Sequence, residues 1–234
     1  MIKNCPVCES GEVLSFLSRI DVPVHQSMLL ASPESAVAIS RGDLELKVCR
    51  QCGFIFNAAF DEKKLSYNQQ YDNSQNYSSV FHQYTEKLCR YILQECGNSH
   101  HTVVEVGCGK AGFLRQLFSL NDQLTGYGFD PSYVGPDIDF GGRLQFIRDF
   151  YGEHYEYIKA DIVICRHVIE HISDPVSLLR SVRRALRNSP SARVYFETPS
   201  VEWILENLVV WDFFYEHRSE ERRVGKECRS RWSP

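Results

Sequence analysis

The sequence has no run of 18 consecutive apolar residues, so it contains no candidate transmembrane helix. Its N-terminus lacks the apolar stretch of a secretory signal peptide, and we expect a cytoplasmic protein with no membrane partner. Basic residues are not in excess, since 26 Lys and Arg face 30 Asp and Glu. An acidic chain argues against a nucleic-acid partner, because binding to phosphates needs a basic surface. With 234 residues, 43% of them hydrophobic, we expect one large or two small domains with a real core.

The last seventeen residues, 218–234, differ in composition from the rest of the chain. They show no apolar periodicity and hold six Lys or Arg and three Asp or Glu. The segment resembles the in-frame translation of a short-read sequencing adapter, so we interpret it as foreign sequence; a genuine basic tail is the alternative. Without it, 20 basic and 27 acidic residues remain, and the formal charge changes from −4 to −7. On this interpretation the chain is a truncated fragment of a protein that continues past His217.

Nine cysteines are present, and four of them form two C-x-x-C pairs, Cys5 with Cys8 and Cys49 with Cys52. Each C-x-x-C turn directs two thiolates at one point, and two such turns complete the tetrahedral S₄ set of a structural zinc site. Residues 1–62, which hold both pairs, have too little core to fold unaided, so bound metal would supply folding free energy. Free thiols in a reducing cytosol are the alternative.

Local patterns divide the rest of the chain. Residues 63–79 are polar and rich in tyrosine, and they are either a solvated linker or a lid in which Tyr77 reaches inward. This segment and a helix that ends at Gly97 make up a second region, 63–100. Strand-like runs are expected at 13–17, 22–25, 44–48, 102–106, 124–129, 144–148, 161–165 and 192–197, and further helices at 111–120 and 174–187.

The alternation of strands and helices over 101–200 predicts a Rossmann-like α/β domain, a doubly wound parallel sheet of about five strands. Residues 201–217 are expected to begin a further half of the molecule. Each helix should bury one apolar face. The helix before Gly97 is expected to bury Val80, Phe81, Tyr84, Leu88, Tyr91 and Ile92, and the helix at 174–187 to bury Val176, Leu179, Val182 and Leu186 beneath an outer stripe of arginines.

The stretch 102–114 has the pattern of a strand, a glycine turn and a helix. A short β-branched run is typical of a strand buried in a parallel sheet, and it ends at Gly107. Gly109 and Gly112 follow at G-x-G-x-x-G spacing. Ligands of open α/β sheets bind at the carboxyl ends of the strands, where glycines allow close approach and the next helix offers free N–H groups.

Two carboxylates narrow the class of ligand. Glu105 lies inside the strand end, two residues before the first glycine, where a dinucleotide-binding strand is usually apolar. Asp130 closes the next strand and is placed to accept hydrogen bonds from a ribose diol. A ligand with adenosine but no pyrophosphate suits this pair. A nicotinamide or flavin dinucleotide, or a glycine turn needed only for packing, are the alternatives.

The run Glu105-Val-Gly-Cys-Gly-Lys-Ala-Gly112 resembles the first motif of the class I S-adenosylmethionine (SAM) methyltransferases, E/D-x-G-x-G-x-G, except that the third glycine falls one residue later. The resemblance implies a SAM site that includes Glu105, Gly107, Cys108, Gly109, Gly112, Asp130, Pro131, Asp149, Phe150, Arg166 and His167. In this family an acidic residue after the third strand contacts adenine, which implies that role for Asp149, with Phe150 beside the base. Arg166 and His167 would then lie near the methionine end.

The segment His167-Val-Ile-Glu-His171 also matches the H-x-x-E-H pattern of zinc proteases. That chemistry needs both histidines on one helical face, near a third ligand. His167 follows directly on a predicted strand, so we expect both histidines in the turn above the sheet. We therefore interpret this segment as the rim of the cofactor site.

A second resemblance lies in the order of the parts. A zinc module, a polar tyrosine segment, a SAM domain and the element Tyr215-Glu-His217 follow one another as in the deoxysugar C-methyltransferases, over residues 1–217. The resemblance implies methylation of a nucleotide-linked keto-deoxysugar at a carbon next to the ketone. It implies four catalytic residues: His217 as the base, Glu216, His171 and Tyr77. The family often has tyrosine two residues before the glutamate, where this chain has Phe214.

The implied chemistry explains these residue types. A carbon next to a ketone becomes nucleophilic only after it loses a proton, and an imidazole that titrates near neutrality can accept that proton. Three other functions stay open on sequence grounds. They are O- or N-methylation of another small molecule, an NAD-dependent sugar-modifying enzyme, and a non-catalytic zinc module with a degenerate Rossmann domain.

Overall fold

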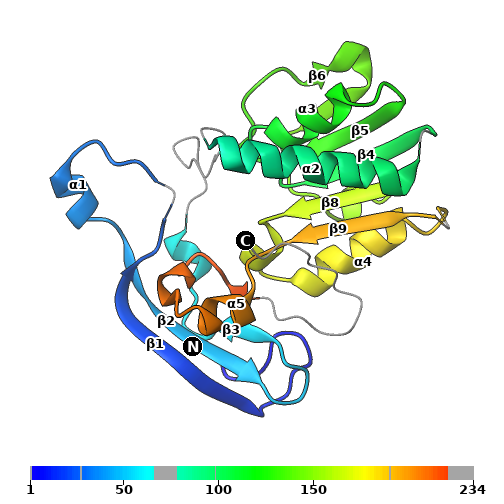
Figure 1. Ribbon diagram of the computed structural model, residues 1–234. Helices are drawn as coiled ribbons and strands as arrows, with labels where there is room; N and C mark the ends of the chain where they lie inside the picture. Colours follow the sequence, from blue (N-terminus) through cyan, green and yellow to red (C-terminus); the bar gives the residue numbers. More distant parts are fainter. Residues whose placement is uncertain (1, 27, 66–77, 98, 190, 221–234) are drawn as a thin grey trace.

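The computed structural model describes residues 2–26, 28–65, 78–97, 99–189 and 191–220 of the chain (Figure 1). Tyr77 lies outside these residues, so the lid expected around it is not part of the described structure. No helix within the described ranges is long and apolar enough to cross a membrane. The described strands form two separate sheets.

The smaller sheet is antiparallel. Its strands are β1 (Val13–Pro23), β2 (Arg41–Cys49), β3 (Ile55–Asn57) and β10 (Ser219–Glu220), with α1 (Pro33–Val37) after β1 and η1 (Glu62–Lys64) after β3. Their order is β1-β2-β3-β10. The sequence predicted two runs, 13–17 and 22–25, where the structure has the single strand β1. Between the two runs the pairing with β2 shifts register, and Asp21 adopts a left-handed conformation (φ 56°). The strand continues through this local distortion.

The core of the smaller sheet comes from both ends of the described chain. Leu44, Leu46 and Ile55 pack against Val201 and Ile204 of α5 (Val201–Glu206) and against Phe213, which follows η5 (Val210–Asp212). Residues 201–217, expected to begin a further half, therefore pack on the N-terminal sheet (Figure 1). The first three residues of the segment interpreted as foreign continue this packing, since β10 pairs with β3 and both of its residues are buried.

The larger sheet confirms the Rossmann-like prediction. Its strands are β4 (His101–Val106), β5 (Leu124–Phe129), β6 (Ile138–Asp139), β7 (Leu144–Ile147), β8 (Ile162–Arg166) and β9 (Arg193–Glu197). Their order is β6-β7-β5-β4-β8-β9, and every pair is parallel except β6 with β7. The helical elements are α2 (Ser79–Cys96), α3 (Gly112–Ser119), η2 (Phe140–Gly142), η3 (Glu153–Tyr155), η4 (Ile169–His171) and α4 (Pro175–Ala185).

Helices cover both faces of this sheet (Figure 1). On one face, Ile92 of α2 and Leu114 of α3 pack with Val103 of β4 in one apolar cluster. On the other face, Leu178 of α4 packs with Val104 of the same strand. Neighbouring residues of β4 thus point to opposite faces, and both faces are apolar, as expected for a buried parallel strand.

The helix faces differ in part from the prediction. Helix α2 buries Thr85, Cys89 and Ile92, whereas Val80 and Tyr91, which were expected to be buried, are 74% and 44% exposed. An apolar pattern does not predict that Thr85 is buried, because threonine is polar. In the structure its hydroxyl donates a hydrogen bond to the carbonyl of His82 at 3.0 Å, which offsets the cost of burial.

Helix α4 buries a different face from the one that the sequence pattern predicted. It buries Leu178, Ser181, Val182 and Ala185, while Leu179, expected to be buried, is 45% exposed. Two of the buried residues, Ser181 and Ala185, are small, and an apolar pattern alone does not mark them as buried. The arginine stripe is exposed, as predicted.

Candidate functional site

Two segments of the predicted site meet at the carboxyl edge of the larger sheet. The order of the strands reverses between β4 and β8, which is where ligands bind in open α/β sheets. The glycine turn follows β4, and Arg166 and His167 end β8 or follow it directly. Gly107 of the turn packs against the side chain of Val168. The structure therefore brings both segments to one place.

The glycine turn contains three left-handed residues. They are Gly107 (φ 70°), Gly109 (φ 53°) and Ala111 (φ 62°), and Gly112 then begins α3. Ala111 occupies the place where the methyltransferase motif has its third glycine. For an alanine, this left-handed conformation is roughly 1–2 kcal/mol less favourable than the right-handed one. The turn is therefore strained by that amount at Ala111. Cys108, between the two glycines, is buried.

Asp130 fixes the glycine turn from the neighbouring strand. One carboxylate oxygen accepts a hydrogen bond from the backbone N–H of Gly109 at 2.8 Å. The other accepts from the backbone N–H and the hydroxyl of Ser132, at 2.8 and 2.6 Å, across Pro131. A carboxylate offers about four acceptor positions, so Asp130 can hold the turn and still accept a hydrogen bond from a ligand hydroxyl.

Two buried groups of opposite charge lie beside the turn without full hydrogen bonding. Glu105 is 3% exposed, and its Oε2 has no hydrogen-bond partner in the described structure. The same holds for Nη2 of Arg166. Burial raises the pKa of Glu105 to about 8, with Asp130 adding to the rise and Arg166 opposing it. A ligand that carries both an ammonium and a carboxylate group would satisfy these two orphaned atoms.

Glu197, at the end of β9, organises the rim of the site. Its two oxygens accept hydrogen bonds from Nε of Arg166 and from the hydroxyl of Tyr84, both at 2.5 Å, and Nε2 of His167 lies 3.4 Å away. Burial opposes ionisation of Glu197, but His167 and Arg166 lower its pKa to about 2. The guanidinium carbon of Arg166 also lies 4.2 Å from the ring centre of Phe113.

Neither Glu197 nor Tyr84 was predicted to be a site residue, although Tyr84 was expected on the buried face of its helix. A signal existed for Glu197, because a carboxylate at the carboxyl end of a predicted parallel strand lies at the ligand edge of the sheet. No local signal marks Tyr84, which reaches Glu197 only because α2 packs over the sheet. His167 has a positive φ of 53° and lies in the turn above the sheet, as predicted. Burial opposes its protonation, but Glu170 and Glu197 raise its pKa to about 9.

Asp149 and Phe150 follow β7 on the same edge. Asp149 accepts hydrogen bonds from the backbone N–H of Phe150 at 2.8 Å and from the hydroxyl of Tyr155 at 2.7 Å. The hydrogen bond from Tyr155 lowers the pKa of Asp149. Phe150 is 67% exposed, so its ring is available for stacking on a flat ligand group.

A cluster of ionisable side chains lies beside the cofactor edge. The rings of His171 and His217 meet edge to face, with centroids 5.0 Å apart. Nδ1 of His171 hydrogen-bonds the backbone carbonyl of Glu216, and Nδ1 of His217 hydrogen-bonds Oε1 of Glu220, each at 3.0 Å. Glu170 is 1% exposed and approaches His171 and His217.

The pKa values of the two histidines in this cluster are shifted in opposite directions. Burial, together with the neighbouring His217, lowers the pKa of His171 to about 4. Burial also opposes protonation of His217, but the hydrogen bond with Glu220 raises its pKa above the ordinary value. For Glu170, the interaction with His167 outweighs burial and lowers the pKa. Glu216 is buried as well, but the carboxylate that contacts Nδ1 of His217 belongs to Glu220.

The N-terminal module holds His217 in this cluster. The hydroxyl of Tyr215 accepts a hydrogen bond from the backbone N–H of Asp61 at 2.9 Å, and its ring stacks on Phe60. Arg218 then bridges the two parts, because its N–H donates to the carbonyl of Glu170 and its carbonyl accepts from Asn57. Residues 215–218 therefore connect the smaller sheet to η4.

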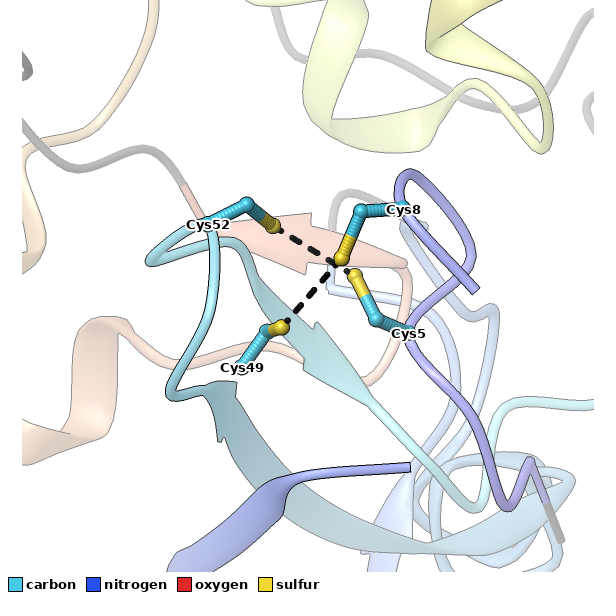
Figure 2. Close-up of side chains that lie close together, drawn as sticks. All are labelled: Cys5, Cys8, Cys49 and Cys52. Atoms are coloured by element: carbon cyan, nitrogen blue, oxygen red, sulfur yellow. Dashed lines mark hydrogen bonds between the residues drawn. The ribbon is translucent and has the colours of Figure 1, made fainter. Parts of the chain in front are cut away.

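The four predicted zinc ligands come together (Figure 2). Sγ of Cys5 lies 3.6 Å from Sγ of Cys52, and Sγ of Cys8 lies 3.5 Å from Sγ of Cys49. Disulfide sulfurs would be about 2.05 Å apart. Zinc–sulfur bonds of about 2.3 Å in a tetrahedron place the sulfurs about 3.8 Å apart. The cluster therefore has the dimensions of a tetrathiolate metal site.

The chain is similar in sequence to known methyltransferases. A family model described as a methyltransferase domain matches residues 80–228 of the chain. Ubiquinone biosynthesis O-methyltransferases of Yersinia pestis and Yersinia pseudotuberculosis are 28% identical to it over 115 residues, which make up 46% of this chain and 47% of those proteins. The match thus spans about half the length of these curated relatives.

Two solved structures also match part of the chain. The plantazolicin methyltransferase BpumL in complex with SAH gives a TM-score of 0.42 at 14% identity, covering 61% of this chain and 56% of that one. YcgJ from Bacillus subtilis gives a TM-score of 0.43 at 17% identity, covering 61% and 64%.

Proposed function

The chain belongs to the methyltransferase-domain family, and we propose that it binds SAM and directs methyl transfer to a small-molecule acceptor. One observation carries the proposal: Glu105 and Arg166 each leave a buried polar atom without a hydrogen bond beside the glycine turn. These atoms suit the α-ammonium and α-carboxylate groups of the methionine part of SAM. When bound, SAM supplies a methyl group on a sulfonium sulfur and leaves as a neutral thioether.

The other predicted residues would hold the adenosine part. Asp130 keeps acceptor capacity for the ribose hydroxyls, and Asp149 with the exposed ring of Phe150 would contact adenine. Gly107 and Gly109 allow the backbone to approach the ligand. A dinucleotide-binding strand is usually apolar at the position of the buried Glu105, which favours SAM over NAD at this site.

We assign the acceptor side to Glu170, His171 and His217. An acceptor carbon or oxygen must lose a proton before it attacks the methyl group, and a site beside the cofactor edge with two imidazoles suits that task. The resemblance to deoxysugar C-methyltransferases makes a carbon next to the ketone of a nucleotide-linked sugar our first candidate, with His217 as the base. The curated relatives are named for O-methylation in ubiquinone biosynthesis, so a hydroxyl oxygen is the second candidate.

We assign a structural zinc ion to Cys5, Cys8, Cys49 and Cys52. Four thiolates leave no open coordination position, so this ion would take no part in the chemistry. Its role would be to stabilise the smaller sheet, which in turn holds Tyr215 and His217 in place. The zinc module would therefore support the acceptor site indirectly.

Calorimetry with SAM, with SAH and with NAD tests the cofactor. We expect the chain to bind SAM and SAH but not NAD, and Asp130→Asn to weaken SAM binding by about tenfold or more, since the turn loses a charged acceptor. Asp122→Asn, which changes an exposed carboxylate outside the site, should leave the affinity unchanged. Binding of NAD without SAM contradicts the proposal.

Turnover assays test the acceptor. His217→Ala should abolish methyl transfer to a keto-deoxysugar nucleotide while SAM affinity stays the same. Transfer to a catechol or phenol but not to the keto sugar would favour the second candidate. Retained turnover of either acceptor in His217→Ala would remove His217 from the mechanism.

A further inference from the structure

The H-x-x-E-H segment has an arrangement that the cofactor site does not explain. Glu170 and His171 lie on η4, and His217 approaches them from the far end of the described chain. One possible ligand atom from each residue lies within 4.8 Å of the other two. Three side chains of metal-binding types thus converge on one point.

Glu170 is the unusual member of this set. Its side chain is 1% exposed, and neither carboxylate oxygen has a hydrogen-bond partner in the described structure. Nδ1 of His167 lies 3.7 Å from Oε1 of Glu170 and makes an ionic contact with it. A buried carboxylate without hydrogen bonds is costly unless a cation compensates it. Beyond the ionic contact with His167, both oxygens of Glu170 therefore keep acceptor positions on the side where His171 and His217 converge.

The two histidines are held as metal ligands usually are. Nδ1 of His171 donates to the carbonyl of Glu216, which can only accept, so the neutral ring carries its lone pair on Nε2. Nδ1 of His217 is hydrogen-bonded to the carboxylate of Glu220, a residue of the segment interpreted as foreign, so in this chain the second ring is fixed in the same way. Metal-binding imidazoles characteristically donate their other N–H to a carbonyl or carboxylate that orients the ring.

We propose that Glu170, His171 and His217 bind a divalent transition-metal ion through one carboxylate oxygen and two imidazole nitrogens. Metal–ligand bonds of about 2.0–2.2 Å bring the three atoms slightly closer together than they lie here, which small side-chain rotations achieve. Imidazole ligands favour zinc, iron or nickel over magnesium or calcium. Three protein ligands leave at least one coordination position open.

The open position would take an oxygen of the acceptor, and here the inference rests on the proposed function. A metal-bound hydroxyl, or a carbon next to a metal-bound carbonyl, loses its proton more readily. With both bound, the acceptor would lose its proton to water and form a bond to the methyl carbon, and the sulfur–methyl bond would break with its electron pair on sulfur. In this arrangement His217 would act as a metal ligand in place of the base role given above, and the ion would supply the acidity.

Titration of the metal-free, reduced chain with Co²⁺ tests the site without any assay of turnover. Thiolate ligands give strong charge-transfer absorption, which reports the Cys₄ cluster alone. We expect a second equivalent of Co²⁺ that adds only the weaker d–d bands of nitrogen and oxygen ligands. Saturation at one equivalent, with thiolate bands only, overturns the proposal.

Variants locate the second ion. His171→Asn, His217→Asn and Glu170→Gln should each keep the thiolate bands and weaken the second binding event by at least about tenfold. His154→Asn, which changes an exposed histidine, is the matched control and should retain both events. Persistence of the second event in all three variants also overturns the proposal.

Two further measurements complete the test. If a variant loses its thiolate bands as well and so fails to fold, X-ray absorption of the wild-type protein with two Co²⁺ decides, because the second ion must then show nitrogen and oxygen neighbours without sulfur. Calorimetry with SAM on the same samples separates the two claims. SAM binding without a second metal overturns only the metal site, and a second metal without SAM binding overturns only the proposed cofactor.

Discussion

A Cβ atom at Gly107 would lie 2.2 Å from Cγ2 of Val168. This contact joins the glycine turn after β4 to the segment that carries Glu170 and His171. No methyl group fits between the two segments, and the backbone of Gly107 also has a φ of 70°. The proposed cofactor side and the proposed acceptor side are therefore packed directly against each other.

Gly107→Ala should destabilise the protein and weaken SAM binding. The positive φ costs roughly 1–2 kcal/mol for an L-residue, and overpacking against Val168 adds roughly 1–3 kcal/mol. Urea unfolding and calorimetry measure the two effects. Gly97→Ala is the matched control, because it has a similar φ of 75° with nothing within 4 Å of the new Cβ. It should lose stability only, and Val168→Ala should restore part of the Gly107→Ala loss.

Glu105 should make folding stability depend on pH. Its pKa is about 8 in the folded state and has its ordinary value near 4.5 in the unfolded chain. Between these values only the folded state holds the proton, so stability present below about pH 4.5 is lost as pH rises toward 8. Unfolding of the wild type and of Glu105→Gln should be compared at pH 5.5 and 8.5.

The Gln variant isolates this effect, because other groups titrate equally in both proteins. We expect the stability difference between the two proteins to change by several kcal/mol at most across the range, on the scale of about 1.4 kcal/mol per pKa unit. Parallel pH profiles for the wild type and Glu105→Gln would show that Glu105 titrates normally.

Glu197→Gln should weaken SAM binding through Arg166. The substitution keeps the shape but removes the negative charge that holds the guanidinium at 2.5 Å. Hydrogen bonds to charged groups contribute about 1.5–3 kcal/mol, so we expect a loss of tenfold or more in affinity by calorimetry. Glu206→Gln, at an exposed carboxylate of α5, should have no effect. Equal affinities for the two variants would exclude a role of Glu197 in positioning Arg166.

Tyr215→Phe should loosen the connection between the smaller sheet and His217. The loss of the hydroxyl leaves the N–H of Asp61 without its partner and should cost about 1 kcal/mol. Tyr157→Phe, at a tyrosine that is 74% exposed, should cost nothing measurable. Urea unfolding gives both values, and a neutral Tyr215→Phe would show that water replaces the bond.

Removal of the metal from the Cys₄ cluster should unfold the smaller sheet. Cys8→Ser should lower bound zinc, measured by atomic absorption, and reduce the stability of the whole chain, since three thiolates bind zinc less tightly than four. Cys96→Ser changes a thiol outside the cluster and should keep the zinc content of the wild type. Equal zinc contents in the two variants would contradict the assignment.

Local patterns determined most of the elements. The predicted strands 102–106, 124–129 and 161–165 differ by at most one residue at either end from β4, β5 and β8. Strand and helix periods are properties of short windows, so a single sequence carries them. The position of the predicted cofactor residues at one edge of the sheet was foreseeable for a related reason. They directly follow parallel strands, and the carboxyl ends of such strands lie on one edge of the sheet.

Only the tertiary structure decided the contacts between distant segments. Tyr215 meets the backbone of Asp61 across 154 residues of sequence, and His217 meets His171 because of that anchor. Tyr84 reaches Glu197 in the same way. Such contacts depend on how whole elements pack, and no short window records that packing. The sequence by itself determined most of the elements and the sheet edge on which the predicted cofactor residues lie, whereas only the packing of whole elements brought His217 against Glu170 and His171.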